Sequence, residues 1–328
     1  MVKPIVFLGD PHLSDRQIST RVDDTTETCL EKFEWVLNYA KSIDANIICT
    51  GDMFTHTLFN NRTRYRLKKA IREYRYSGGW LWSISGNHSG DIEDRNPDSA
   101  LYRELGQFVL DGYVNFLGCF DRYCRSYFLD RSLTNSPVII GYSAYCTDVN
   151  DSVAESLSDR VIGMVCHHFI GQECFGDPLV IYPDDMKKVF PNLRFIVGGH
   201  DHAHHVPYMS RDGVWVVRPG SMMRTDSGES SKRIPCVEVL YPRMDGEPDR
   251  WEIVPIACAR SYDEVFFAEK RDINAGSVNA LERFVRQMQE QTNVVMDINS
   301  AVKEQFALVP HEDRDMVRAD LAAQGFMV

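Results

Sequence analysis

Five short stretches of this chain share one chemical pattern: each follows, or nearly follows, an apolar run and supplies Asp, Asn or His. The apolar runs have the length of buried strands. Residues two apart on an extended chain point to the same side, so a carboxylate and an imidazole in such a stretch can face one ion. The five stretches are Gly9–His12, Gly51–Asp52, Gly86–His88, Cys166–His168 and Gly199–His202.

Histidine is concentrated in these stretches. Nine of the ten histidines lie in or beside them, and only His311 is remote. A lone histidine is usually an ordinary polar residue, but the joint pattern predicts a metal centre. Two divalent ions can clamp a phosphate and generate hydroxide at neutral pH, with one carboxylate bridging them. Oxygen and imidazole ligands suit manganese, iron or zinc.

Composition limits the class of protein. A length of 328 residues favours one large domain with an appendage. The net charge of −11 argues against a protein that binds nucleic acids or other polyanions over its whole surface, but it is compatible with a local basic surface. The nine cysteines form no CxxC pair, which favours reduced thiols in the cytoplasm. We see no signal peptide and no apolar run near ~20 residues, so no membrane span is expected.

The order of the elements predicts an α/β fold. Strands alternate with helices early in the chain, and strands that look antiparallel follow later, which favours two mixed sheets with helices outside. We expect a domain at 1–260 and a small helical C-terminal appendage at 261–328. The main predicted strands are 4–9, 45–50, 80–85, 161–166, 194–197, 206–209, 214–217, 234–240 and 251–256. The main predicted helices are 25–42, 62–76, 99–110, 184–189, 277–291, 299–308 and 312–324.

The five stretches, taken in order as DxH, GD, GNH, HH and GHxH, resemble the calcineurin-like metallophosphoesterase superfamily over about residues 1–225. The resemblance implies a four-layer α/β/β/α sandwich and a binuclear site. His88 would be the acid beside the leaving oxygen, and His167 rather than His168 would be a ligand. His204 and His205 would lie outside the ligand set. One ion would take Asp10, His12, Asp52 and His202, and the other Asp52, Asn87, His167 and His200, with Asp52 bridging.

Within the superfamily the chain resembles the SbcD-type DNA repair nucleases, including compact versions encoded by bacteriophages. The motifs are FLGDPHLSD, CTGDMF, ISGNH, VGGHDHAHH and VVRPGSMMRTDSGESSKRIPCVEV. Two positions depart from the family pattern. Ser89 stands where an Asp often follows the GNH histidine, and Thr55 takes the slot of a histidine that here comes one later, as His56.

The resemblance implies a metal-dependent DNA endo/exonuclease subunit that hydrolyses phosphodiester bonds with metal-activated hydroxide. We expect two divalent ions, manganese first, with iron, zinc or magnesium as alternatives. The expected partners are single- or double-stranded DNA and an SbcC-like coiled-coil ATPase, since this chain has no Walker A loop; a homodimer is a further option. The alternative is a small-molecule phosphodiesterase or nucleotidase that uses the same dinuclear site.

The helix predicted at 62–76 is strongly basic, with seven Lys or Arg between residues 62 and 75. It would contact the DNA backbone through Arg64, Lys68 and Lys69, or it would be an ordinary solvated helix face. The C-terminal helices would cap DNA, dock a partner or pack on the chain's own core.

Overall fold

The computed structural model of the chain describes residues 2–55, 58, 60–87, 104–120, 123–125, 127–129, 136–142, 158–171, 180–243 and 248–266. The chain divides into two units, Met1–Asn274 and Ala275–Val328, and all described residues belong to the first. The three predicted C-terminal helices lie outside the described residues, and the predicted domain boundary after residue 260 stays a prediction. No helix among the described residues is long and apolar enough to cross a membrane.

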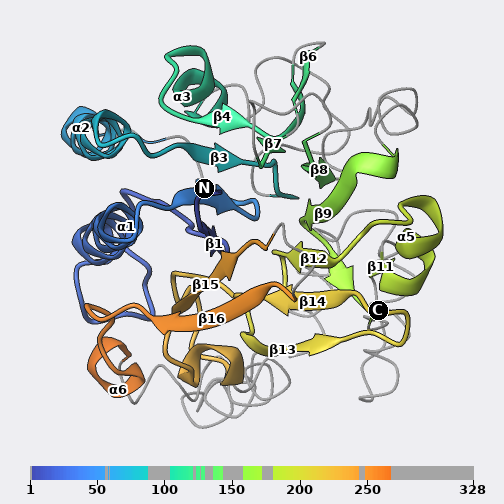
Figure 1. The fold of residues 1–328 in the computed structure, drawn as a ribbon. Coiled ribbons are helices and arrows are strands. Elements are labelled where there is room, and N and C mark those ends of the chain that lie inside the picture. The colour runs from blue at the N-terminus through green and yellow to red at the C-terminus, as the bar shows by residue number, and fades with distance from the viewer. Residues whose placement is uncertain are drawn as a thin grey trace, which may run out of the picture. The chain divides into compact units, whose positions relative to one another are not determined.

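The first of two six-stranded sheets carries the N-terminal strand near its middle (Figure 1). Four of its strands, β1 to β4, are parallel, while β15 is antiparallel to β1 and β16 is antiparallel to β15. Its order is β16 (Arg250–Pro255), β15 (Cys236–Tyr241), β1 (Ile5–Leu8), β2 (Asn46–Cys49), β3 (Leu81–Ser83) and β4 (Asn115–Phe116).

The second sheet is also mixed. Strands β8, β9, β12 and β14 are parallel, and β7 and β13 are antiparallel to their neighbours at the two edges. The antiparallel pairing expected for the later strands is confirmed for β13 with β14 and for β15 with β16, and β14 also pairs parallel with β12. The order is β13 (His205–Met209), β14 (Trp215–Arg218), β12 (Phe195–Gly198), β9 (Val161–Cys166), β8 (Val138–Tyr142) and β7 (Tyr127–Phe128).

The two sheets pack face to face. In β1 the side chains alternate between two cores: Ile5 and Phe7 belong to a buried cluster that also contains Phe195 and Val197 of β12. The rings of Phe7 and Phe195 meet edge to face, with their centroids 6.1 Å apart. Burying such side chains stabilises the fold by about 1.5–3 kcal/mol each.

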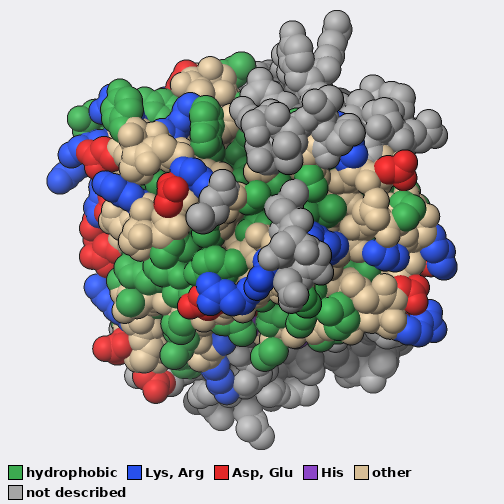
Figure 2. All heavy atoms as spheres, in the orientation of Figure 1, with side chains coloured by type: hydrophobic (Ala, Val, Ile, Leu, Met, Phe, Trp, Pro, Cys, Tyr) green, Lys and Arg blue, Asp and Glu red, His purple; other side chains and the backbone are tan. Residues whose placement is uncertain are grey.

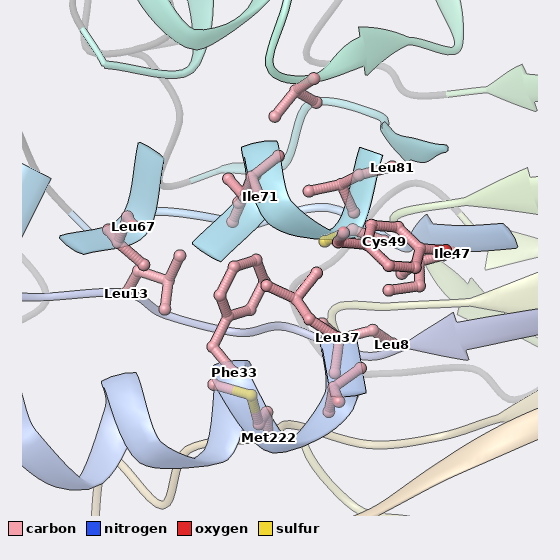
Figure 3. Close-up of a cluster of buried hydrophobic side chains, with 14 of the residues drawn as sticks. Leu8, Leu13, Phe33, Leu37, Ile47, Cys49, Leu67, Ile71, Leu81 and Met222 are labelled. Atoms are coloured by element: carbon pink, nitrogen blue, oxygen red, sulfur yellow. The ribbon is translucent and has the colours of Figure 1, made fainter. Parts of the chain in front are cut away.

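Helices cover the outer face of the first sheet. The helices α1 (Thr25–Ser42), α2 (Asn61–Tyr76) and α3 (Gly106–Leu110) share a buried cluster with Val6 and Leu8 of β1. Figure 3 shows Phe33 and Leu37 of α1 beside Leu67 and Ile71 of α2 and Leu8 of the sheet.

Another layer covers the second sheet. The helix α5 (Pro183–Val189) packs Met186 against a cluster that contains Met164 of β9 and Ile196 of β12. Two mixed sheets with helices on both outer faces confirm the predicted α/β/β/α sandwich. The shorter elements are β5 (Gly118–Phe120), β6 (Tyr123–Arg125), η3 (Ser158–Arg160), β10 (Phe169–Ile170), β11 (Val180–Ile181), η4 (Glu229–Lys232) and α6 (Tyr262–Val265).

Candidate metal centre

The carboxyl ends of parallel strands from both sheets supply the predicted ligands. Asp10 and Asp52 follow β1 and β2, and Asn87 follows β3. From the second sheet, His167 follows β9 and His200 follows β12. Side chains separated by up to about two hundred positions in the sequence meet here because the two sheets are stacked with these strand ends close together.

Asp10, His12 and His202 form the first group that could hold an ion. The Nε2 atoms of the two histidines lie 3.0 Å apart, and their rings meet edge to face. Asp10 Oδ2 lies 3.6 Å from His202 Nε2. A carboxylate oxygen and two imidazole nitrogens thus converge on one point.

Asp10, Asp52 and His167 form the second group. His167 Nε2 lies 3.2 Å from Asp52 Oδ2, and His167 Nδ1 lies 3.8 Å from Asp10 Oδ1. All three side chains are buried. Asp10 is the carboxylate common to both groups, whereas the resemblance assigns the bridging role to Asp52; that role of Asp52 stays a prediction.

Asn87 and His200 join the cluster beside the second group. Asn87 Oδ1 lies 2.9 Å from His167 Nε2 and 3.1 Å from His200 Nδ1. The ring of Phe169 meets the His200 ring edge to face, with the centroids 4.9 Å apart. All seven predicted ligand side chains are therefore linked through direct contacts.

The backbone of the ligands is unusual. Among the described residues, five other than glycine have a positive φ, and four of these are predicted ligands: Asp10, His12, Asp52 and His200. This conformation costs a non-glycine residue about 1–3 kcal/mol, and such residues cluster at functional sites. Gly86 allows a close approach nearby, since a Cβ there would lie 2.1 Å from Asp52 Oδ1.

The electrostatics of the cluster fit a bound cation. Burial raises the pKa of Asp10, and the charge of Asp52 raises it further, while His167 and His202 oppose the shift. Burial alone would lower the pKa of His167, but Asp10, Asp52 and the Thr50 carbonyl raise it to about 9. Two buried carboxylates with imidazole and amide donors are a set of ligands that suits divalent manganese, iron or zinc.

Several groups that orient the ligands lie outside the sequence motifs or belong to the main chain, so the motifs do not predict their roles. The carbonyl oxygen of Thr50 lies 2.9 Å from His167 Nδ1 and accepts a hydrogen bond from it in the tautomer that is protonated at Nδ1. The Thr55 hydroxyl lies 3.4 Å from His12 Nδ1. The backbone N–H of His200 donates to Asp10 Oδ2 at 2.9 Å. Thr55 was visible in the sequence only as a departure from the family pattern.

The other predicted residues of the site lie as follows. His88, His56 and Ser89 are outside the described residues. Among the described residues, the two groups that could hold an ion include His167 and not His168. Outside these groups, His204 Nε2 lies 2.9 Å from Glu238 Oε1, and His205 Nε2 lies 2.9 Å from Asp201 Oδ2.

The basic helix α2 uses much of its charge in ion pairs. Arg64 pairs with Glu104 at 2.8 Å, and Lys68 pairs with Asp111 at 2.7 Å. Lys69 is exposed, and its Nζ is 3.9 Å from Glu73. Figure 2 shows Lys and Arg side chains mixed with Asp and Glu on the side where α2 lies.

A sandwich of two mixed sheets that brings carboxylates and imidazoles together at its strand ends suits a metal-dependent hydrolase. The chain belongs to the calcineurin-like phosphoesterase family, whose model matches residues 3–204.

The solved structures that resemble this chain include two of low sequence identity. One is the calcineurin-like phosphoesterase YfkN from Bacillus subtilis, with 14% identity over 78% of this chain and 91% of that chain and a TM-score of 0.43. The other is GAP50, described as the anchor in the inner membrane complex of Plasmodium, with 12% identity over 79% of this chain and 86% of that chain and a TM-score of 0.46. No curated protein matches the sequence.

Proposed function

We propose that the protein is a metal-dependent DNA nuclease of the SbcD type that hydrolyses phosphodiester bonds. The observation that carries the hydrolytic part is the joint placement of Asp10, Asp52 and His167 in one buried group beside His12 and His202. Two divalent ions bound there would polarise the phosphoryl group and lower the pKa of the attacking water.

The chain's own residues would hold the two ions, orient the ligands and protonate the leaving oxygen. We propose the ligand sets that the resemblance implies: Asp10, His12, Asp52 and His202 for one ion, and Asp52, Asn87, His167 and His200 for the other. The contacts of Thr50 with His167 and of Thr55 with His12 orient two of these imidazoles. His88 would donate a proton to the leaving oxygen.

The exposed face of α2 supports DNA as the substrate. Five exposed residues recur along it at intervals of three and four, so they line one side of the helix. Tyr65 and Tyr76 are 65% and 83% exposed, which leaves their rings available to stack on bases. The stripe consists of Arg62, Tyr65, Lys69, Arg72 and Tyr76. Of the predicted contacts, Lys69 lies in the stripe, while Arg64 and Lys68 would have to leave their acidic partners to reach DNA.

A nuclease assay tests the proposal. With Mn²⁺, the protein is expected to cut single- or double-stranded DNA, and Asp52→Ala and His88→Ala are each expected to abolish cutting. Turnover of a chromogenic diester without cutting of either DNA would instead identify a small-molecule phosphodiesterase.

The basic stripe has its own test. We expect Arg72→Glu and Lys69→Glu to weaken DNA binding and to reduce the slope of log affinity against log salt by about one each. Lys188→Glu on α5, also an exposed lysine, is the matched control. If the slope of log affinity against log salt is unchanged in both variants, the stripe is an ordinary solvated helix face that does not contact DNA.

We also propose an SbcC-like coiled-coil ATPase as partner, supported by the resemblance of the segment 216–239 to the SbcD-type nucleases. Co-expression with such an ATPase is expected to give a complex that cuts DNA in an ATP-dependent manner. Separate elution of the two proteins would contradict this assignment.

A further inference from the structure

One loop, residues 219–224, forms hydrogen bonds with both main-chain segments that carry the first group of ligands, the segment of Asp10 and the segment of His202. On one side, the N–H of Met222 donates to the carbonyl oxygens of Gly9 and Asp10, and the Ser221 hydroxyl donates to the Asp10 carbonyl at 3.1 Å. On the other side, the Ser221 N–H donates to the His202 carbonyl at 3.1 Å. A Cβ on Gly9 would lie 1.9 Å from the Gly220 carbonyl oxygen, so the two backbones are as close as they can be.

Arg233 fastens this loop to the strand end that carries His202. Its guanidinium group donates through Nε and Nη2 to the His202 carbonyl, at 2.8 and 2.5 Å. The same Nη2 donates to the Ser221 carbonyl at 2.5 Å. One planar side chain therefore sets the distance between the main chains of His202 and Ser221, and through Ser221 that of Asp10.

Other cations hold the same loop from the core side. Arg224, with 2% of its surface exposed, donates to the carbonyl oxygens of Arg233 and Arg260. Arg21 donates to the Arg224 carbonyl at 2.8 Å, and Lys32 donates to the Met222 carbonyl at 3.1 Å. The Met222 side chain packs in the core beside Phe33 of α1 (Figure 3). The loop and Arg233 are thus held from several sides.

We propose that Arg233 is a positioning residue for the metal position formed by Asp10, His12 and His202. Within the described part of the chain its hydrogen bonds go to main-chain carbonyl oxygens, so it acts on the main chain from which two of those ligands project. In the ligand sets proposed above, the second position draws on Asp52, Asn87, His167 and His200 and not on Asp10, and Arg233 donates no hydrogen bond to those segments in the described part of the chain. This inference rests on the metal centre and does not depend on DNA as the substrate.

Replacement of Arg233 should therefore affect the two ions unequally. Loss of a group that orients metal ligands typically weakens metal affinity about 10–100-fold. We expect Arg233→Gln to weaken one of two Mn²⁺ affinities by about tenfold or more and to leave the other within about twofold of the wild type. Arg233→Lys keeps the charge but offers its donors from a single nitrogen, so its Mn²⁺ affinity should fall in between.

The experiment is a Mn²⁺ titration of the full chain by calorimetry, with free Mn²⁺ followed by electron paramagnetic resonance. The matched control is Arg211→Gln, which removes a guanidinium group whose side chain is 84% exposed. The melting temperature of each metal-free variant shows whether it still folds. Two Mn²⁺ ions in the wild type, one weakened ion in Arg233→Gln, unchanged melting and a partial effect in Arg233→Lys support the proposal.

Other outcomes overturn it. If Arg233→Gln binds both Mn²⁺ ions with wild-type affinity, the guanidinium group is not needed to position the ligands. Equal weakening of both ions together with a lower melting temperature would show a purely structural role. If the wild type binds no Mn²⁺, the proposed metal centre is wrong and this inference falls with it. If the wild type binds two ions but cuts no DNA, only the nuclease assignment is contradicted.

Discussion

Replacement of Lys32 by methionine is expected to change how the stability of the protein depends on pH. Lys32 is 1% exposed, and its Nζ donates to the Met222 carbonyl at 3.1 Å. Burial lowers the pKa of this amine from 10.5 to about 7, and the charges of Arg21 and Arg224 act in the same direction. The unfolded chain restores the ordinary pKa, so between these two values the unfolded state binds a proton that the folded state does not.

The sign and size of the effect follow from this difference. When the unfolded state binds more protons, stability rises with pH, so the wild type should gain stability as the pH rises from 7 towards 10.5. For a single group with these two pKa values, the gain between pH 7 and about pH 9 is about 2 kcal/mol. Lys32→Met lacks this contribution, so its stability relative to the wild type should fall by the same amount over that range.

Urea unfolding followed by tryptophan fluorescence measures both proteins at each pH. The other titrating groups are present in both chains, so the difference between them isolates Lys32. A difference in the free energy of unfolding that stays constant from pH 7 to about pH 9 would show that Lys32 has an ordinary pKa, and would refute the argument from burial.

Three further results are expected at the metal centre. Gly86→Ala should weaken metal binding on the order of tenfold or more, because its Cβ would meet Asp52 Oδ1 at 2.1 Å; wild-type Mn²⁺ affinity in a titration would contradict this. Thr55→Val should weaken Mn²⁺ binding about tenfold by removing the hydroxyl beside His12, whereas Thr55→Ser should retain it; equal loss in both variants would exclude a role for the hydroxyl. Mn²⁺ at about 100 times its dissociation constant should stabilise the fold by about 2.7 kcal/mol for each ion bound, reversed by a chelator, and an unchanged melting temperature would contradict binding to the folded state.

The sequence was most informative where local pattern and local chemistry agree. The helix predicted at 25–42 is α1, because Asp24 caps its first turn and its apolar stripe faces the sheet. The strand predicted at 161–166 is β9, which is buried along its whole length. The ligand stretches were visible because each combines a buried strand with a distinctive residue type at its end.

The remaining features depend on tertiary contacts that leave no local pattern. The parallel pairing of β14 with β12 could not be predicted, because the sequence of a strand that pairs antiparallel with one neighbour does not show how it pairs with the other. The strands β10 and β11 are two residues each, too short for any periodicity. Arg233 acts on main-chain carbonyls, which every residue has, so its partners could not be read from residue types.

The central claim is that side chains from both sheets bind two ions at one site. Anomalous diffraction from a crystal soaked in Mn²⁺ tests this most directly. We predict two peaks about 3.5–4 Å apart, in contact with Asp10, His12, His202, Asp52 and His167. Full-occupancy Mn²⁺ elsewhere on the protein, with none between these side chains, would contradict the account.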